Sequence, residues 1–215
     1  MAQRFRWTAF DVTRLLPLDY PDDIKAVAAD ADFRQYPRTP LLSREADDVT
    51  HITRGRVRAD KVELRLPWLY KLYRSDFLEL AELAWGEPIK AAFDDRYGIV
   101  LNVQQGNTMR FECHVDSNPV TGLLFFTDHP AGGGELVVAD DPEAVGVETL
   151  EKDGSVIRPQ AGQLIFFDGK TYPHYARTLQ SGSDMRVVAV MNFYTESCPE
   201  STRPSRLNRH LFGED

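Results

Sequence analysis

The chain has few cysteines, only Cys113 and Cys198 among 215 residues, and they form no metal-binding or disulfide pattern. This scarcity argues against the disulfide framework of small secreted domains and favours a reducing, cytoplasmic location. The sequence also lacks an apolar run long enough to cross a bilayer, so we expect no membrane span. Residues 1–10 have no apolar core of the kind that a signal peptide or anchor requires.

An excess of positive charge is also missing, because the formal net charge is -8 at pH 7. Binding to a nucleic-acid backbone depends on neutralising phosphates with Lys and Arg, so no nucleic-acid partner is expected. The hydrophobic content of 42% is ordinary for a globular protein and argues against disorder. We therefore expect a single domain over residues 1–215 that acts on a small molecule. The oligomeric state is not indicated.

The residue pattern changes near residue 89, from helical spacing before it to short β-rich runs after it. Residues 1–88 read as a helical and strand-containing cover, with helices expected over 24–31 and over 66–85, the latter divided at Ser75-Asp76. Residues 89–200 read as a β core, and residues 201–215 as a C-terminal tail. Short β-rich runs separated by Gly, Asp and Pro predict a sandwich or jelly roll, mainly β with helical cover. The expected strands are 98–104, 109–115, 122–127, 135–139, 156–158, 163–167, 174–179 and 186–194.

The pair His114-x-Asp116 is the first candidate for chemistry. Alternate residues of a strand point to the same face, so these two side chains can reach one metal ion. The pair ends the β-rich run 109–115 and is followed by the turn-forming string Ser117-Asn118-Pro119.

A third ligand is expected from His174, which follows the apolar strand 163–167 and a turn, and begins another strand. His51 and His210 lie in polar surroundings and are expected at the surface, and His129 reads as a solvated turn residue before three glycines. Two His and one carboxylate form the facial triad that binds iron(II) and leaves positions open. Zinc in a hydrolase would use similar ligands, so the ligand set leaves the metal open.

Arg186 is the candidate for gripping an anion, because it begins a strand that returns beside His174 and its guanidinium pairs bidentately with carboxylates. The face that Arg186 occupies cannot be derived from the sequence. Arg177 is a rival, although alternation places it on the face opposite to His174. Arg110 and Asn118 are the candidate substrate-binding residues, with a solvated surface as the ordinary alternative for an arginine.

Taken in order, His114-x-Asp116, His174 and Arg186 resemble the iron(II)/2-oxoglutarate-dependent oxygenases, in particular the prolyl-4-hydroxylase-like branch. The resemblance covers residues 97–195. The string Gly106-Asn107-Thr108-Met109-Arg110-Phe111-Glu112-Cys113-His114-Val115-Asp116 is similar to the oxygen-sensing prolyl hydroxylases, and the branch is also matched by Gly133-Gly134-Glu135-Leu136 and Pro159-x-x-Gly162-x-Leu164-x-Phe166.

This resemblance implies a double-stranded β-helix (jelly-roll, cupin-like) fold with N-terminal helices and with iron(II) at one end. It implies that 2-oxoglutarate chelates the iron, that Arg186 binds its distal carboxylate, and that O2 is consumed with release of succinate and carbon dioxide. Asp116 implies hydroxylation rather than halogenation. The sequence departs from the branch at three positions where tyrosine is common: Gln104, Phe111 and Phe126.

The preferred interpretation is a dioxygenase that hydroxylates an unactivated C–H bond of a free amino acid or a small natural-product intermediate. The first alternative is a prolyl hydroxylase that acts on a protein or peptide. The second is a non-redox, cupin-like metal-binding sensor or isomerase, although such a site favours His-x-His and Asp116 breaks that pattern.

Overall fold

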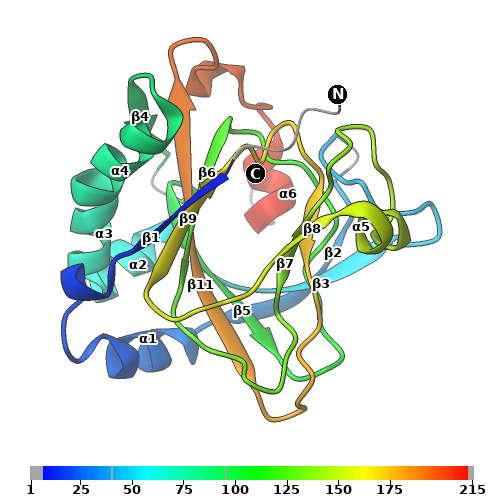
Figure 1. Cartoon of the computed structure of the whole chain (residues 1–215), viewed down its shortest axis with the longest axis horizontal. Helices are drawn as coiled ribbons and strands as arrows, with labels where there is room; N and C mark the ends of the chain where they lie inside the picture. Colours follow the sequence, from blue (N-terminus) through cyan, green and yellow to red (C-terminus); the bar gives the residue numbers. More distant parts are fainter. Residues whose placement is uncertain (1–6, 40, 95, 213–215) are drawn as a thin grey trace.

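Two antiparallel sheets face each other in the computed structural model, which describes residues 7–39, 41–94 and 96–212 (Figure 1). The larger sheet has the order β1 (Trp7–Asp11), β9 (Gln163–Phe167), β6 (Val120–Phe125), β11 (Met185–Thr195), β5 (Ile99–Gln105), β3 (His51–Val57) and β2 (Asp32–Pro37), and β4 (Ile89–Ala91) also pairs with β11. The smaller sheet has the order β10 (His174–Ala176), β7 (Leu136–Val138) and β8 (Ser155–Ile157). The chain therefore has the expected double-stranded β-helix.

Four helices cover the outer face of the larger sheet, on the left of Figure 1: α1 (Tyr20–Ala28), α2 (Ala59–Arg65), α3 (Pro67–Arg74) and α4 (Asp76–Trp85). Elsewhere lie η1 (Thr13–Leu15), α5 (Val147–Asp153), η2 (Glu200–Thr202) and α6 (Leu207–Phe212). In α4, Phe77 and Ala81 are four residues apart on one face and are both fully buried. The helix ends at Gly86, whose φ of 78° is the left-handed conformation that glycine accepts without strain. None of the helices in these residues combines the length and the apolar character that crossing a bilayer requires.

The long strand β11 divides the molecule into two packed layers, because successive side chains point to opposite faces. Val187, Ala189 and Met191 belong to the core beneath the helices. Val188 belongs to the core between the two sheets, and Val190 packs against that core. Arg186 has the parity of Val188, so it also faces the space between the sheets.

The N-terminal cover contributes both helices and strands. β1 extends one edge of the larger sheet by pairing with β9, and β3 and β2 extend the other edge next to β5.

The expected break in the helix over 66–85 occurs at Ser75, between α3 and α4. The hydroxyl of Ser75 makes no capping bond to α4, because it donates to the carbonyl of Lys71 instead. Residues 201–212, expected in a tail, contain part of η2 and all of α6, where Leu207 is buried.

One expected strand, 109–115, is not a regular strand. Only His114 forms a β-bridge here, to His174 on one side and Ser43 on the other. His114 exchanges two backbone hydrogen bonds with His174, whereas the next bond runs from the Phe111 amide to the Ala176 carbonyl. Three residues on one side thus span two on the other, which is a β-bulge. The amide of Cys113 leaves the ladder and donates to the Glu45 carboxylate at 2.6 Å.

We predict that Phe77→Ala lowers the free energy of unfolding by about 3–5 kcal/mol, because it empties a fully buried position between α4 and the sheet. Leu83→Ala, on the same helix but 72% exposed, is the matched control and should change the stability by no more than about 0.5 kcal/mol. Urea unfolding followed by circular dichroism measures both. Equal losses in the two variants would contradict this account of the core.

Candidate metal centre

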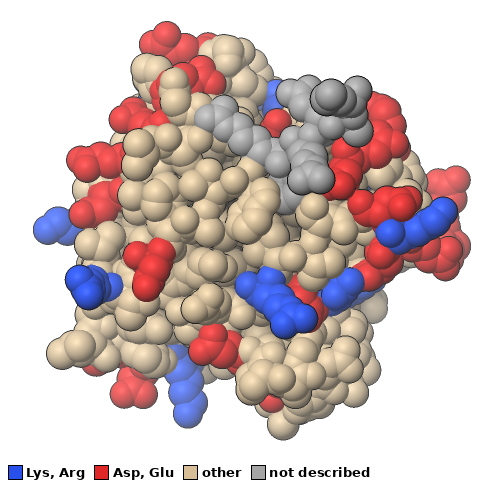
Figure 2. Space-filling model, in the orientation of Figure 1, with Lys and Arg blue, Asp and Glu red and all other residues tan. Residues whose placement is uncertain are grey.

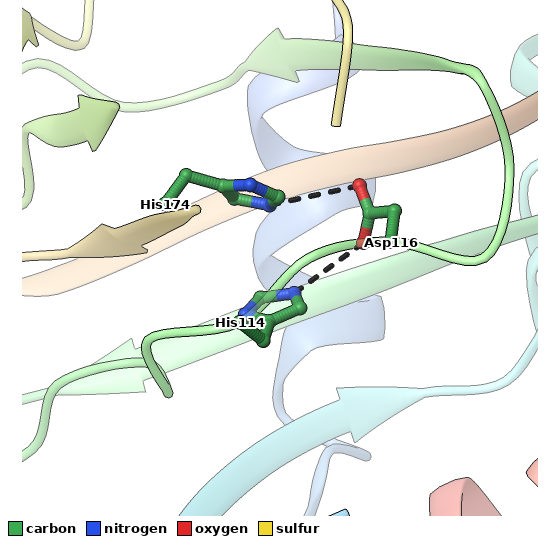
Figure 3. A group of neighbouring side chains, drawn as sticks. All are labelled: His114, Asp116 and His174. Carbon is green, nitrogen blue, oxygen red and sulfur yellow. Dashed lines mark ion pairs between the residues drawn. The ribbon is translucent and has the colours of Figure 1, made fainter. Parts of the chain in front are cut away.

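Three side chains converge between the sheets: His114 from the bulged segment, Asp116 two residues later, and His174 at the start of β10 (Figure 3). Each offers one ligand atom, and these atoms all lie within 4.8 Å of one another. The Nε2 atom of His114 lies 3.4 Å from Oδ1 of Asp116, and Nε2 of His174 lies 3.6 Å from Oδ2. Two imidazoles and a carboxylate can therefore reach one ion together.

Backbone carbonyls fix the ring orientation of both histidines. Nδ1 of His114 lies 2.7 Å from the carbonyl oxygen of Glu112, and Nδ1 of His174 lies 3.0 Å from that of Tyr172. A carbonyl only accepts hydrogen bonds, so in each ring Nδ1 carries the proton and donates it. In the neutral form of each ring, Nε2 is therefore the nitrogen without a proton, and it points toward Asp116 with a lone pair that a metal ion can accept.

The electrostatics keep this cluster ready for a cation. Burial lowers the pKa of His174 to about 4, so that ring is neutral at physiological pH. Burial alone would raise the pKa of Asp116, but the two neighbouring imidazoles and the Thr121 hydroxyl outweigh it and hold that pKa well below its usual value. For His114, burial opposes protonation, yet the hydrogen bond and charge of Asp116 prevail and raise its pKa. Asp116 is thus an anion between two nitrogen ligands.

A second set of residues supports Asp116. Its amide donates to the carbonyl of Gly169 at 2.7 Å, and its carboxylate accepts from the Thr121 hydroxyl. The Asn118 side chain donates to Thr121 at 3.0 Å and accepts from the Tyr97 hydroxyl at 2.7 Å. A Cβ atom on Gly169 would collide with the Asp116 carboxylate, so only glycine allows this approach. The sequence revealed Gly169 only as part of a turn.

Arg186 lies in a cavity that also contains the three candidate ligands. Its side chain is buried, its Nε atom has no hydrogen-bond partner among the described residues, and its guanidinium carbon lies 5.6 Å from the centroid of the Phe125 ring. Burial lowers the pKa of Arg186 to about 10, so it remains charged at neutral pH. Apolar walls complete the cavity: Leu123, Leu136, Phe167, Val188 and Val190. A buried cation in such a pocket calls for an anionic ligand.

The rival arginine faces outward. Arg177 pairs with the Glu151 carboxylate at 2.5 Å, and about a third of its side chain is exposed. The register places Arg186 opposite Gln104 of β5, on the inner face of the sheet, which decides the orientation that the sequence left open.

His129 does not match the solvated turn residue that its polar loop predicts. Its side chain is only 3% exposed and lies 3.0 Å from the Thr127 hydroxyl. The glycine turn explains this burial, because Gly134 has a φ of 71° and brings the loop against both Arg186 and His129. Burial and the charge of Arg186 lower the pKa of His129, which keeps it neutral. His51 is exposed as expected, and the side chain of His210 lies outside the described residues.

The candidate substrate-binding residues have other partners. Arg110 forms a two-pronged ion pair with Glu45, at 2.5 and 2.8 Å, and Asn118 is fully buried behind Asp116. Neither lines the cavities at the metal centre.

Phe126 faces the helical layer, 6.4 Å from the Trp68 ring, so Phe125 is the aromatic residue beside Arg186.

A second cavity meets the first at the metal centre and extends toward α6. His114, Asp116, Asn102, Phe111 and Val190 line both cavities. The second cavity is also lined by polar residues of the larger sheet and by two leucines of α6: Arg54, Arg56, Asn192, Leu207 and Leu211. An ion at the triad would therefore lie at the junction of two chambers.

We predict that Gly169→Ala weakens iron(II) binding at least about tenfold, because the added methyl group displaces the Asp116 carboxylate. Gly182→Ala is the matched control, since a Cβ there meets no atom closer than 3.7 Å. Anaerobic metal titration measures both affinities, and circular dichroism checks that the fold is retained. Unchanged affinity in Gly169→Ala would show that Asp116 does not depend on this contact.

Comparisons with known proteins place the fold. No family model matches the sequence, and no curated protein matches it. Among solved structures, a non-haem alpha-ketoglutarate-dependent epimerase, SnoN from nogalamycin biosynthesis, is similar with a TM-score of 0.63, 12% identity, and coverage of 89% of this chain and 78% of that chain. SnoN has also been solved with Fe3+, alpha-ketoglutarate (2-oxoglutarate) and nogalamycin RO.

Two further structures show the same likeness. A 2OG-Fe(II) oxygenase family oxidoreductase from Burkholderia pseudomallei has a TM-score of 0.59 and 15% identity, over 92% of this chain and 89% of that chain. A prolyl hydroxylase from Trichoplax adhaerens, in complex with a hypoxia-inducible-factor peptide fragment, has a TM-score of 0.57 and 12% identity, over 89% and 84%. The chain thus has the double-stranded β-helix fold of the iron(II)- and 2-oxoglutarate-dependent oxygenases.

Proposed function

We propose that the chain is an iron(II)- and 2-oxoglutarate-dependent dioxygenase that hydroxylates an unactivated C–H bond of a small molecule. The observation that carries this proposal is one cavity that joins a two-histidine, one-carboxylate cluster to a buried arginine whose Nε atom has no hydrogen-bond partner among the described residues. A metal alone would explain the cluster, but only a ligand that bridges the two ends explains the arginine.

The residues fit iron(II) as the metal. His114, Asp116 and His174 would hold it through three positions and leave the others open, as in the facial triad of non-haem iron oxygenases. Iron with 2-oxoglutarate would supply the oxidising power, coupling activation of O2 to release of succinate and carbon dioxide. Thr121 and the two backbone carbonyls orient the ligand atoms before any ion arrives.

Arg186 fits the role of holding the distal carboxylate of 2-oxoglutarate. A planar guanidinium binds a carboxylate through two parallel hydrogen bonds, which fixes direction as well as position. The apolar walls exclude water and strengthen this pairing. Phe125 and Phe126 offer no hydroxyl, so Arg186 would hold the carboxylate without help from a tyrosine at these positions.

A small-molecule substrate is favoured over a peptide. The second cavity, on the other side of the triad, is lined by Leu207 and Leu211 of α6. A helix over the cavity suits a compact substrate better than an extended chain. The SnoN structure with nogalamycin RO and the Trichoplax structure with a peptide show that the fold serves both kinds of ligand. Prolyl hydroxylation of a protein therefore remains the alternative, and a non-redox sensor or isomerase would leave Arg186 unexplained.

A cytoplasmic location is proposed from the composition. Both cysteines are free thiols, Cys113 in the core and Cys198 partly exposed. Free thiols agree with a reducing compartment.

We predict that the protein, given iron(II) and 2-oxoglutarate without oxygen, develops a visible metal-to-ligand charge-transfer band, and that it forms succinate in air. Asp116→Ala should lose both signals, because the carboxylate is the only anionic ligand of the triad. Anaerobic absorption spectroscopy and succinate quantification measure them. A wild-type protein that binds iron(II) but gives no band would favour the non-redox alternative.

We predict that Arg186→Leu raises the 2-oxoglutarate concentration needed for half-maximal band formation by at least about thirtyfold, since a buried charge pair is lost. Arg177→Leu is the matched control and should leave this concentration unchanged, because Arg177 pairs with Glu151 at the surface. The same anaerobic titration serves both variants. An effect in Arg177→Leu alone would transfer the role to that residue.

A further inference from the structure

Three charged side chains meet in the second cavity. Arg54 and Arg56 lie two residues apart on β3, so both face the interior, and Glu112 enters from the bulged segment before His114. Arg54 is 5% exposed and Glu112 is 2% exposed. Nη2 of Arg54 donates to Oε2 of Glu112, and Nε of Arg56 lies 3.3 Å from Oδ1 of Asn102. The group is thus built into the wall of the cavity that reaches the metal centre.

The pairing of Arg54 with Glu112 is incomplete. Nη1 of Arg54 and Oε1 of Glu112 are both buried, and neither has a hydrogen-bond partner among the described residues. A buried polar atom without a partner costs about 1–3 kcal/mol, and more when the group is charged. Native proteins keep such atoms where a ligand or an ordered water completes them. Here the donor and the acceptor without partners belong to the two side chains of one buried ion pair.

Two arginines and one glutamate lie close together in this wall. Arg54 and Arg56 contribute two positive charges and Glu112 contributes one negative charge. The remaining carboxylate of the cavity, Asp116, faces the metal centre. Burial lowers the pKa of Arg56 to about 10, and the nearby charge of Arg54 adds to this effect. An anionic acceptor on the substrate would satisfy Nη1 of Arg54, and a hydrogen-bond donor beside it would satisfy Oε1 of Glu112.

We propose that the second cavity binds a free α-amino acid, with its carboxylate on Arg54 and Arg56 and its ammonium group on Glu112. This inference rests on the proposed oxygenase function and names its substrate class. In an α-amino acid, one carbon separates the two charged groups, which suits a vacant donor and a vacant acceptor on paired side chains. The amino-acid side chain then points toward His114 and Asp116, where a C–H bond meets the metal. A peptide-linked residue carries neither charge.

Glu112 would contribute both to substrate binding and to the orientation of a metal ligand. Its side chain would hold the ammonium group, while its backbone carbonyl orients the ring of His114 at 2.7 Å. Arg56 and Leu211 line both this cavity and a hollow at the surface, where Arg34, Arg58 and Lys61 are found. The cavity and the surface hollow therefore adjoin at these two residues, beside α6.

The test uses the anaerobic complex of the protein with iron(II) and 2-oxoglutarate. Each proteinogenic L-amino acid is added in turn, and its binding is followed as a perturbation of the charge-transfer band. The carboxamide and the N-acetyl derivative of the tightest-binding amino acid are then compared with the parent. We expect at least one amino acid to bind, and both derivatives to bind at least about tenfold more weakly, since each removes one charge.

Variants assign the residues. Arg54→Met and Glu112→Gln should each weaken binding of the parent amino acid at least about tenfold while the band with 2-oxoglutarate still forms, which shows that the variants are folded. Arg65→Met is the control, because Arg65 is an exposed arginine of α2 that pairs with Asp30. If Arg54→Met does not fold, the comparison of derivatives on the wild-type protein still decides the question.

The failures are distinguishable. A band that forms with 2-oxoglutarate and responds to no amino acid would overturn this inference, leave the oxygenase function standing, and assign the vacant atoms of Arg54 and Glu112 to ordered water. Derivatives that bind as well as the parent would overturn it as well and favour a peptide. Absence of the band itself would reject both the function and the substrate class.

Discussion

The buried carboxylate of Asp116 is the constraint on which the rest of the site depends. A carboxylate in a protein interior is costly unless hydrogen bonds and positive charge surround it. Thr121 supplies a hydrogen bond, and Gly169 supplies the room and an acceptor for the Asp116 amide. Both histidines point Nε2 at this carboxylate, and in the neutral form of either ring that nitrogen has no proton to donate to it. A divalent cation satisfies all three side chains at once.

The strand β11 also combines a buried polar group with a well-packed environment. Its alternation sends one set of side chains into the helix-covered core and the other into the space between the sheets. The first set stabilises the strand, so the second set can include Arg186, which is buried and whose Nε atom has no hydrogen-bond partner among the described residues. Arg186 is four residues from Val190, which lines both cavities, or roughly 13 Å along the strand. One well-packed strand therefore fixes how far Arg186 lies from the part of the space that both cavities share.

Much of this arrangement is readable from the sequence because it depends on local patterns. Strand alternation relates His114 to Asp116, and short apolar runs predict most strands of the β core. The segment 109–115 fails as a strand because its bulge arises from pairing with β10 and from the distant carboxylate of Glu45, neither of which has a local signal. The burial of His129 depends in the same way on the glycine turn packing against Arg186.

The wall of the second cavity could not be predicted from the sequence at all. Arg54 lies on an N-terminal strand that the sequence does not distinguish, and Glu112 is 58 residues away. No local pattern predicts the burial of these two side chains, which follows from the pairing of β3 with β5 and from the contact of Arg54 with Glu112. Once buried, a pair that leaves one donor and one acceptor without partners is energetically incomplete. A ligand that carries both charges would complete this pair, as we propose, and so no local sequence pattern could have predicted the binding site.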